Sequence, residues 1–527
     1  MCRPAVRDGG GRAAPLYHQP AGTYAGLRMK SQAQLIAYVD RLPGGTFRDL
    51  KQLLDDGPLQ GAFGGVHVLP FFHPIDGADA GFDPIDHTQV DHRLGGWDDV
   101  TALAGRTEVM AGVIVNHVSS RSPRFQDYLR HGENSPYAGM FLTYSRLYPQ
   151  GARESDLLAL HTTRPMLPLT TYETATGERA LLWTTFTSDQ IDIDVSHPEG
   201  RRYLADVLAR FHAAGIKAIR LDAVGFTVKK AGTSCFMIPE TFAFIAEFAA
   251  QAHACGMEVL VEVHGHYQDQ IDVARQVDWV YDFALPPLVL HTLYTRNAAA
   301  LARWLEIRPG NTVTVLDTHD GIGVQDVGAD RRRGRIEGLL TAEECDALVE
   351  TIHRRSRGES RHASGSAANN VDSSQINCTF YDALGGNDSE YLIARAIQCF
   401  VPGIPQIYYV GLLAGSNDLD LLRRTGVGRD INRRYYTTEE LEQAVARPVV
   451  RSLLELLRTR NTHQAFGGAF HMVPSPPERL VLEWKNGTVF ARLDVNLNQM
   501  SATVFCSGDG ADVGDTAAWQ VGTEARR

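Results

Sequence analysis

Short apolar runs that alternate with helix-like stretches constrain the fold of this chain more than any other feature. Residues 35–39, 66–70 and 113–117 are rich in β-branched and aliphatic side chains, which is typical of buried parallel strands. Stretches of helical period, such as 97–104 and 203–214, lie between such runs. Strand–helix alternation over about 400 residues predicts an α/β protein whose parallel strands close into a (β/α)8 TIM barrel.

The pattern continues to an eighth strand but is interrupted twice. Further strand-like runs lie at 218–222, 259–262, 279–283, 312–316 and 403–410. Polar, turn-rich sequence at 118–198 and 322–385 breaks the alternation, which predicts two inserted subdomains. The barrel would then comprise 29–117, 199–321 and 386–465. Alternating segments within 466–527 predict a small C-terminal antiparallel β domain.

Residues 1–28 differ from the rest of the chain. They are rich in Gly, Arg, Ala and Pro and lack the apolar core of a secretory signal. We expect a disordered extension ahead of a natural start at Met29.

Composition excludes several classes of protein. The chain is 44% hydrophobic and 21% charged, as expected of a globular protein with a large core. A formal net charge of −11 argues against a nucleic-acid partner. No apolar stretch approaches the length of a membrane span. Seven scattered cysteines without C-x-x-C spacing favour a reducing, cytoplasmic compartment.

Three acidic residues follow strand-like runs at intervals that suit one and two strand–helix repeats. They are Asp222, Glu262 and Asp320. In a barrel all three carboxyl groups would project from the C-terminal rim, where such barrels carry their chemistry. Carboxyl groups in different environments there can divide into acid and base roles.

Strand-end motifs carry a family resemblance. Asn116-His117, Arg220-Leu221-Asp222-Ala223, Glu262-Val263-His264 and His319-Asp320 are similar to the signatures of the α-amylase family of glycoside-active (β/α)8 barrels, glycoside hydrolase family 13. Longer stretches resemble sucrose phosphorylases and their close relatives. These stretches are 69–72, 79–86, 231–236, 281–287, 316–323 and 428–433. The likeness runs from about residue 30 to the end and is weakest after 465.

The resemblance implies a retaining mechanism with assigned residues. Asp222 would be the nucleophile, Glu262 the proton donor and Asp320 a stabiliser of the transition state. Arg220 would keep Asp222 ionised, whereas Glu262 would need a raised pKa and a less compensated site. Glucose-binding residues would be Asp79, Phe82, His117, Phe186, Arg220, His264, His319 and Arg429.

The same resemblance implies phosphorolysis without a metal or other cofactor. Phosphate would replace water as the attacking group, so that sucrose and phosphate would give α-glucose 1-phosphate and fructose. Arg164, His264, Asp372 and Gln375 would serve the acceptor or phosphate. The small-residue tract 363–370 would let the second insertion change pose. The resemblance also implies a homodimer.

The acceptor region departs from the sucrose phosphorylase pattern. The chain has His161, Thr163, Ser373 and Ser374 where that pattern has bulkier or aromatic residues. Smaller and more polar walls leave alternative substrates open, namely sucrose 6-phosphate, glucosylglycerol and glucosylglycerate.

Other interpretations of these residues remain. The histidines and phenylalanines could be core residues, and Arg429 could bridge surface carboxylates. His264 and His266 form an H-x-H pair, which in a barrel can ligate zinc, so a metal-dependent amidohydrolase is a competing class. A barrel that only binds partners is another, although three intact acids disfavour it.

Overall fold

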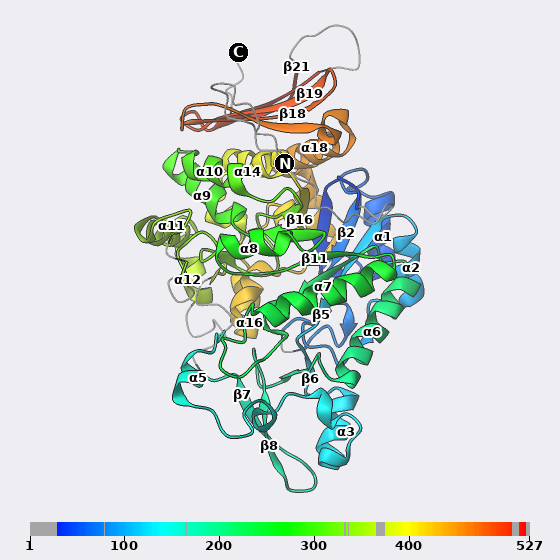
Figure 1. The fold of residues 1–527 in the computed structure, drawn as a ribbon. Coiled ribbons are helices and arrows are strands. Elements are labelled where there is room, and N and C mark those ends of the chain that lie inside the picture. Colours follow the sequence, from blue (N-terminus) through cyan, green and yellow to red (C-terminus); the bar gives the residue numbers. More distant parts are fainter. Residues whose placement is uncertain are drawn as a thin grey trace, which may run out of the picture.

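Eight parallel strands form the closed barrel that the alternation predicts. The computed structural model describes residues 29–77, 79–163, 166–330, 334–335, 337–364, 375–507 and 516–522. Around the barrel the strands follow the order β1, β16, β13, β12, β11, β10, β5, β2 (Figure 1). Their bounds are β1 Gln34–Ala37, β2 Gly65–Val68, β5 Glu108–Ile114, β10 Ala218–Asp222, β11 Glu258–Val261, β12 Trp279–Asp282, β13 Thr312–Thr314 and β16 Ile404–Tyr408.

The barrel strands are buried because helices cover their outer side. Every residue of β10 and β11 is buried, which explains the near-continuous apolar runs in the sequence. Inside the barrel, polar side chains satisfy one another: Gln406 Nε2 donates to Gln34 Oε1 (2.8 Å), and the Tyr281 hydroxyl donates to Gln406 Oε1 (3.0 Å).

The surrounding helices begin at identifiable capping residues. Helix α6 (Pro198–Ala213) starts with a proline behind His197, whose side chain accepts from the Glu199 amide. It therefore begins earlier than the stretch 203–214 that the sequence predicts. The other helices that cover the barrel are α1 Phe47–Asp55, α2 Trp97–Ala104, α7 Pro239–Ala254, α8 Tyr267–Ala274, α9 Leu285–Thr295, α10 Ala299–Ile307, α14 Asp388–Phe400 and α18 Pro448–Thr462.

The chain leaves the barrel sooner after the third strand than expected. Strand β5 ends at Ile114, and His117 opens a separate strand, β6 (His117–Ser119), which pairs antiparallel with β9 (Gln190–Asp192). The interpretation of 113–117 as one barrel strand is wrong, because the chain turns away once its apolar run is exhausted. The segment between β6 and β9 carries α3 Pro123–His131, α4 Tyr144–Leu147, α5 Glu154–Leu158, β7 Leu169–Glu173 and β8 Arg179–Trp183.

A second excursion follows β13. Strands β14 (Ile322–Gly323) and β15 (Gln375–Ile376) pair antiparallel near the rim. The remaining elements of this part and of the turns around the rim are β3 Phe72–His73, β4 Asp86–Val90, α11 Ala342–Arg355, α12 Glu359–Ser364, α13 Phe380–Ala383, α15 Tyr409–Leu412, α16 Leu419–Thr425, η6 Gly428–Asn432 and α17 Thr438–Ala446.

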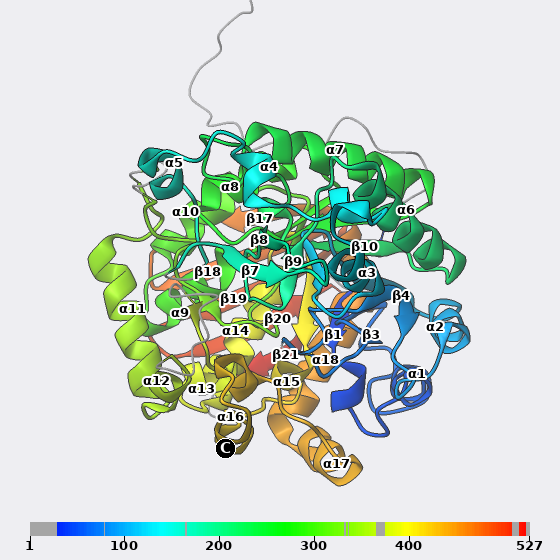
Figure 2. The same cartoon turned by 90° about the horizontal axis from the view of Figure 1, so that it is seen from below.

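A five-stranded antiparallel sheet ends the chain, as the alternating segments predict. It comprises β17 Ala469–Val473, β18 Arg479–Asn486, β19 Val489–Asn496, β20 Ser501–Cys506 and β21 Thr516–Val521. The sheet docks on helices α14 and α18, where Trp484 donates to the Phe400 carbonyl (2.8 Å) and Trp519 to the Ser452 carbonyl (3.0 Å). The sheet and the segment with β7 and β8 lie at opposite ends of the molecule (Figures 1 and 2).

Two further expectations concern features of the whole chain. The predicted extension 1–28 lies outside the described residues. Within the described part, Cys235, Cys255, Cys345, Cys378, Cys399 and Cys506 are free thiols. No helix there combines the length and the apolar character needed to cross a bilayer.

Candidate active site

A cavity of about 260 Å³ opens among the barrel strand ends and the segment between β6 and β9. Most of the predicted site residues line it, although they come from distant parts of the chain. They are Asp79, Phe82, His117, Phe186, Asp222, Glu262, His264, His319, Asp320 and Arg429. The structure thus brings the three predicted acids together at one rim.

Arg220 links two of these acids. It lies on β10 two residues before Asp222, and β11 pairs beside it in parallel register with Arg220 opposite Leu260. One guanidinium nitrogen donates to Asp222 Oδ1 (2.6 Å), and another donates to Glu262 Oε1. Ala223, directly after Asp222, has a positive φ of 54°. Such a backbone is costly for a residue with a Cβ and is typical of functional turns.

The two linked acids differ in pKa, but in the opposite sense to the sequence expectation. Burial raises the pKa of Asp222 to about 7, because it outweighs the contact with Arg220 and the Glu262 charge adds to it. Burial also acts to raise the pKa of Glu262, yet Arg220 and His264 overcome it and lower that pKa to about 2. Glu262 is therefore the better compensated acid in the empty cavity, since one guanidinium serves both carboxyl groups.

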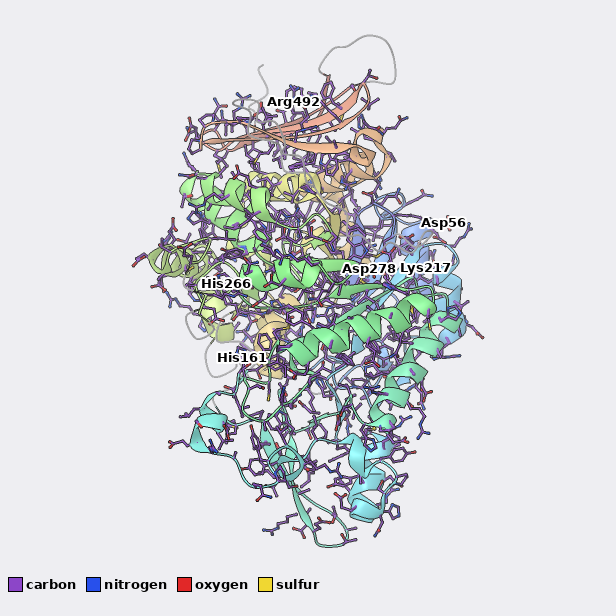
Figure 3. All side chains as sticks on the ribbon, viewed as in Figure 1. Asp56, His161, Lys217, His266, Asp278 and Arg492 are labelled. Atoms are coloured by element: carbon purple, nitrogen blue, oxygen red, sulfur yellow. The ribbon has the colours of Figure 1, made fainter. Side chains whose placement is uncertain are left out.

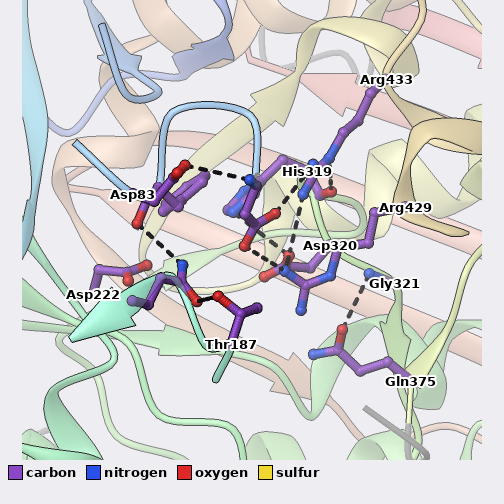
Figure 4. Close-up of polar contacts among 12 residues, drawn as sticks. Asp83, Thr187, Asp222, His319, Asp320, Gly321, Gln375, Arg429 and Arg433 are labelled. Atoms are coloured by element: carbon purple, nitrogen blue, oxygen red, sulfur yellow. Dashed lines mark hydrogen bonds and ion pairs between the residues drawn. The ribbon is translucent and has the colours of Figure 1, made fainter. Parts of the chain in front are cut away.

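A polar wall of ion pairs surrounds Asp320, and we define it as Asp79, His319, Asp320, Arg429 and Arg433. Arg429 Nη1 lies 2.8 Å from Asp320 Oδ1 and 3.7 Å from Asp79 Oδ2. Arg433 lies 3.4 Å from Asp79 Oδ1 and 3.9 Å from Asp320 Oδ1 (Figure 4). Burial acts to raise the pKa of Asp320, but Arg429, His264 and the rest of the polar wall together outweigh it and hold that pKa well below its usual range.

Arg433 is a residue that the sequence analysis missed. It is almost fully buried, and its Nε donates to the His319 carbonyl (2.9 Å). The signal was present, because Arg433 closes the motif 428–433 four residues after Arg429. The interpretation of Arg429 as a bridge on the surface is wrong, since its side chain is only 16% exposed within this wall.

The predicted sugar-gripping rings contact one another. Phe82 stacks on His319 with centroids 4.5 Å apart, and His117 meets Phe186 edge-on at 5.3 Å. His117 Nε2 donates to the Phe82 carbonyl (3.0 Å), so its ring is held by backbone and also faces the cavity. Burial lowers the pKa of His319 to about 3, which leaves this imidazole neutral.

An aromatic wall closes the opposite side, and we define it as His161, Phe186, Phe226 and Phe236. His161 stacks on Phe236 at 4.3 Å, and Phe226 lies 4.6 Å from Phe236 and 5.4 Å from Phe186. Figure 3 shows His161 between the barrel and the segment that carries β7 and β8. Phe226, Phe236, Gln190 and Gln325 also line the cavity. The sequence analysis did not select them, because isolated aromatic and amide residues have no distinctive spacing.

Most of the predicted acceptor residues either lie outside the described residues or do not line the cavity. Arg164, Asp372, Ser373, Ser374 and most of the tract 363–370 lie outside the described residues. Gln375 does not line the cavity; its Oε1 accepts from the Gly321 amide at 3.2 Å (Figure 4). Thr163 does line it, and its hydroxyl donates to the Thr185 carbonyl (3.0 Å).

A buried lysine that the sequence analysis missed joins the cavity to the strand pair β6–β9. Lys229 Nζ pairs with Asp192 and donates to Asn116 Oδ1 (2.7 Å) and to the Phe226 carbonyl. Asn116 directly precedes His117, and Phe226 belongs to the aromatic wall, so Lys229 connects the start of β6 to that wall. Lysine rarely lies this deep unless it is paired.

The H-x-H pair is not arranged as a metal site. His266 Nε2 contacts the Glu337 carbonyl (2.8 Å), and His266 Nδ1 accepts from the Gln268 amide (3.2 Å). Both ring nitrogens of His266 are thus engaged by backbone at the start of α8. Ligand atoms of Glu262, His264 and Asp320 lie within 4.8 Å of one another, but neighbouring carboxylates favour a protonated His264, which is a poor ligand.

Comparisons with known proteins agree with this geometry. A family model described as the catalytic domain of α-amylase matches residues 62–281. The sucrose phosphorylase of Agrobacterium vitis is 58% identical over 480 residues, which cover 91% of this chain and 98% of that protein. The sucrose phosphorylase of Bifidobacterium adolescentis is 50% identical over 88% of this chain and 92% of its own length.

A solved structure is also similar over almost the whole chain. It is the sucrose 6F-phosphate phosphorylase of Thermoanaerobacter thermosaccharolyticum, with a TM-score of 0.85 and 36% identity. The match covers 93% of this chain and 98% of that one.

Proposed function

Because this chain belongs to the α-amylase family of glycoside-active enzymes and is a phosphorylase within it, we propose that it converts sucrose and phosphate to α-D-glucose 1-phosphate and D-fructose. The reaction proceeds by two displacements at the anomeric carbon of glucose. Each displacement inverts that carbon, so the product retains the α configuration.

In the first displacement the glycosidic bond breaks. The Asp222 carboxylate attacks the anomeric carbon and forms a glucosyl ester, while Glu262 gives its proton to the departing fructose oxygen. Positive charge develops at the anomeric carbon, and Asp320 stabilises it from the polar wall. Asp79, Arg429 and Arg433 hold the remote hydroxyl groups of the glucosyl unit.

In the second displacement phosphate breaks the ester. A phosphate oxygen attacks the anomeric carbon, Asp222 leaves as carboxylate, and Glu262 takes up the phosphate proton. Glucose 1-phosphate is released, and both acids return to their starting protonation. No metal or organic cofactor takes part in these steps.

One observation carries the assignment of the two acids. Arg220 contacts both Asp222 and Glu262 at the base of the cavity, which supports the close spacing that retention requires, about 5–5.5 Å between carboxyl groups.

The first displacement requires an ionised Asp222 and a protonated Glu262. Without a substrate the pKa shifts run the other way, because burial raises the pKa of Asp222, whereas Arg220 and His264 outweigh burial at Glu262 and lower its pKa. A bound glucoside presents its bridging oxygen to Glu262, and only the protonated acid can donate to that oxygen. Binding therefore favours transfer of the proton from Asp222 to Glu262.

A different acceptor is the second candidate. His161 and Thr163 line the cavity, and the first could bind a phosphorylated or carboxylated acceptor. Sucrose 6-phosphate, glucosylglycerol and glucosylglycerate are therefore the competing substrates.

The test runs the reaction in both directions. Purified protein is incubated with sucrose and phosphate, and then with glucose 1-phosphate and a panel of fructose, fructose 6-phosphate, glycerol and glycerate. We expect glucose 1-phosphate in the first assay and sucrose from fructose in the second. Disaccharide from another acceptor and none from fructose would contradict the sucrose assignment.

Two further proposals concern the protein in the cell. The free thiols of the described cysteines support a cytoplasmic location. We also propose a homodimer, which light scattering of the purified full chain would test.

A further inference from the structure

Asp326 is a buried carboxylate that the mechanism above does not use. It is fully inaccessible to solvent and lies just after β14. Its Oδ1 accepts from the Gly265 amide (3.1 Å) and from Gln270 Nε2 (3.4 Å). Its Oδ2 has no hydrogen-bond partner among the described residues and lies 3.8 Å from His264 Nδ1. A buried charge is retained when it is paired, and among the described residues His264 faces this carboxylate oxygen.

His264 lies between carboxylates from three parts of the chain. Its Nε2 lies 3.6 Å from Glu262 Oε1, at the end of β11, and 4.0 Å from Asp320 Oδ2, after β13. Asp326 faces the other ring nitrogen from the turn after β14. The ring stacks on Phe283 with centroids 4.0 Å apart, which fixes its plane. Burial alone would lower the pKa of His264, but Asp326 and Glu262 raise it well above its usual value.

The backbone leaves space for this arrangement at Gly323. A Cβ at that position would lie 2.3 Å from Asp326 Oδ2. Any larger residue would therefore displace the carboxylate oxygen that faces His264. The Gly265 amide holds the other oxygen, so both ends of the carboxylate are placed by the chain around His264.

We propose that Asp326 is a positioning residue that fixes His264 as a cation beside Glu262 and Asp320 in the cavity and so allows this site to accept phosphate. The proposal rests on the proposed function. Incoming phosphate meets Glu262 and Asp320, whose negative charges oppose it. A protonated imidazole between them offsets that repulsion and offers an N–H donor. Water and other neutral acceptors do not need this cation.

The test uses the fate of the glucosyl–Asp222 ester. With sucrose and limiting phosphate, this ester gives glucose 1-phosphate when phosphate attacks and free glucose when water attacks. The ratio of the two products depends on the second displacement alone, so it is insensitive to any loss in the first. In Asp326→Asn we expect the ratio to fall about tenfold or more, because a neutral amide no longer supplies the negative charge that pairs with His264.

Two comparison variants make the result specific. His264→Gln removes the cation itself and should lower the ratio as much as Asp326→Asn, while the double variant should fall little further, because both changes remove the same interaction. Asp269→Asn is the matched control: Asp269 is also buried and close to Gly265, but Arg335 is the cation that faces it at 3.9 Å. Its ratio should stay at the wild-type value.

A measurement on the wild-type protein covers the case in which Asp326→Asn does not fold. Nitrogen NMR of histidine-labelled full chain, with His264 assigned through His264→Gln, should show a doubly protonated ring at about pH 7, where an unperturbed histidine is mostly neutral. A neutral His264 at about pH 7 would overturn the proposal.

The outcomes separate this inference from the proposed function. An unchanged ratio in Asp326→Asn, or an equal fall in Asp269→Asn, contradicts the role of Asp326 alone. Absence of glucose 1-phosphate from every glucoside tested with the wild-type protein contradicts the proposed function, and this inference with it.

Discussion

The polar wall and the aromatic wall of the cavity are built by different means. In the polar wall, Arg429 and Arg433 reach across to Asp79 and Asp320 through ion pairs that are mostly buried. In the aromatic wall, His161, Phe226 and Phe236 contact one another through ring faces and edges. Charged groups must be matched partner for partner, whereas ring packing tolerates exchanges of similar volume that alter the polar atoms of a ring.

This difference explains how one scaffold can serve several reactions. In the polar wall, Asp79 lies in the turn between β3 and β4, His319 and Asp320 follow β13, and Arg429 and Arg433 lie on η6 and directly after it. The aromatic wall comes largely from the segment between β6 and β9 and from the turn after β10. A sucrose 6F-phosphate phosphorylase shares the fold at only 36% identity. We infer that changes in the aromatic wall select the acceptor, while the polar wall keeps the glucosyl unit constant.

The largest effect is expected from removing the nucleophile, on which every acceptor depends. Asp222→Asn removes the nucleophile, and phosphorolysis of sucrose should fall by about 10⁴-fold or more, as for other covalent nucleophiles. Release of glucose 1-phosphate measures it, and an unchanged circular-dichroism spectrum controls for folding. Substantial residual turnover would mean that another residue forms the ester.

Glu262→Gln should produce a smaller loss that depends on the leaving group. With sucrose we expect a fall of about 10²–10⁴-fold, because the departing fructose oxygen needs a proton. With α-glucosyl fluoride the loss should be far smaller, since fluoride leaves without one. Initial rates with the two donors measure the difference. Equal losses would remove Glu262 from the role of proton donor.

Arg433→Met should damage the polar wall without changing acceptor preference. Removing a buried guanidinium leaves Asp79 and Asp320 less compensated, which should cost about 3–5 kcal/mol of stability. Rates with every acceptor should fall by a similar factor, on the order of 10²-fold. Denaturant titration and the acceptor panel measure the two effects.

The matched control for that variant is Arg424→Met on the exposed face of α16. It should lose less than about 0.5 kcal/mol, as is usual for surface changes. A change in the ratio of acceptors used by Arg433→Met would contradict the separation of the two walls.

The sequence predicted the barrel strands and the catalytic acids better than the contacts between the side chains of the site. Barrel strands follow from apolar runs, so β16 falls within the predicted 403–410, and the convergence of Asp222, Glu262 and Asp320 follows from their place at strand ends. Arg433 could not be derived in this way, because its contact with Asp79 joins positions 354 residues apart. Such contacts depend on packing rather than on local pattern.

The sequence also could not predict which of the two acids, Asp222 or Glu262, has the higher pKa. The presence of Arg220 near Asp222 predicts a low pKa for Asp222 only if Arg220 serves that acid alone. The structure divides the guanidinium between Asp222, which is buried, and Glu262, whose side chain is 10% exposed. Burial is then the largest influence on the pKa of Asp222, and this burial is visible only in the three-dimensional structure.

The raised pKa of Asp222 predicts that the difference in stability between wild type and Asp222→Asn depends on pH. The pKa of Asp222 is raised from 3.8 to about 7, so the folded protein binds this proton more tightly than the unfolded chain. Stability conferred by the protonated form is therefore lost as pH rises from about 4 to 7. Relative to wild type, Asp222→Asn should gain stability across that window, on the order of 4 kcal/mol in all.

Thermal unfolding of both proteins at a series of pH values measures this gain. A difference that stays constant between about pH 4 and pH 8 would show that Asp222 is already ionised in the empty cavity.

The smallest expected effect concerns the aromatic wall. His161→Phe keeps a ring that can stack on Phe236 but removes the polar nitrogens, so the protein should remain as stable as wild type within about 1 kcal/mol. The ratio of rates with fructose 6-phosphate and fructose should fall by about three- to tenfold, the worth of one polar contact. Initial rates of synthesis from glucose 1-phosphate with each acceptor measure it. Equal changes with all acceptors would place His161 with the polar wall, because only residues that touch the acceptor can alter the choice between two acceptors without altering the common glucosyl intermediate.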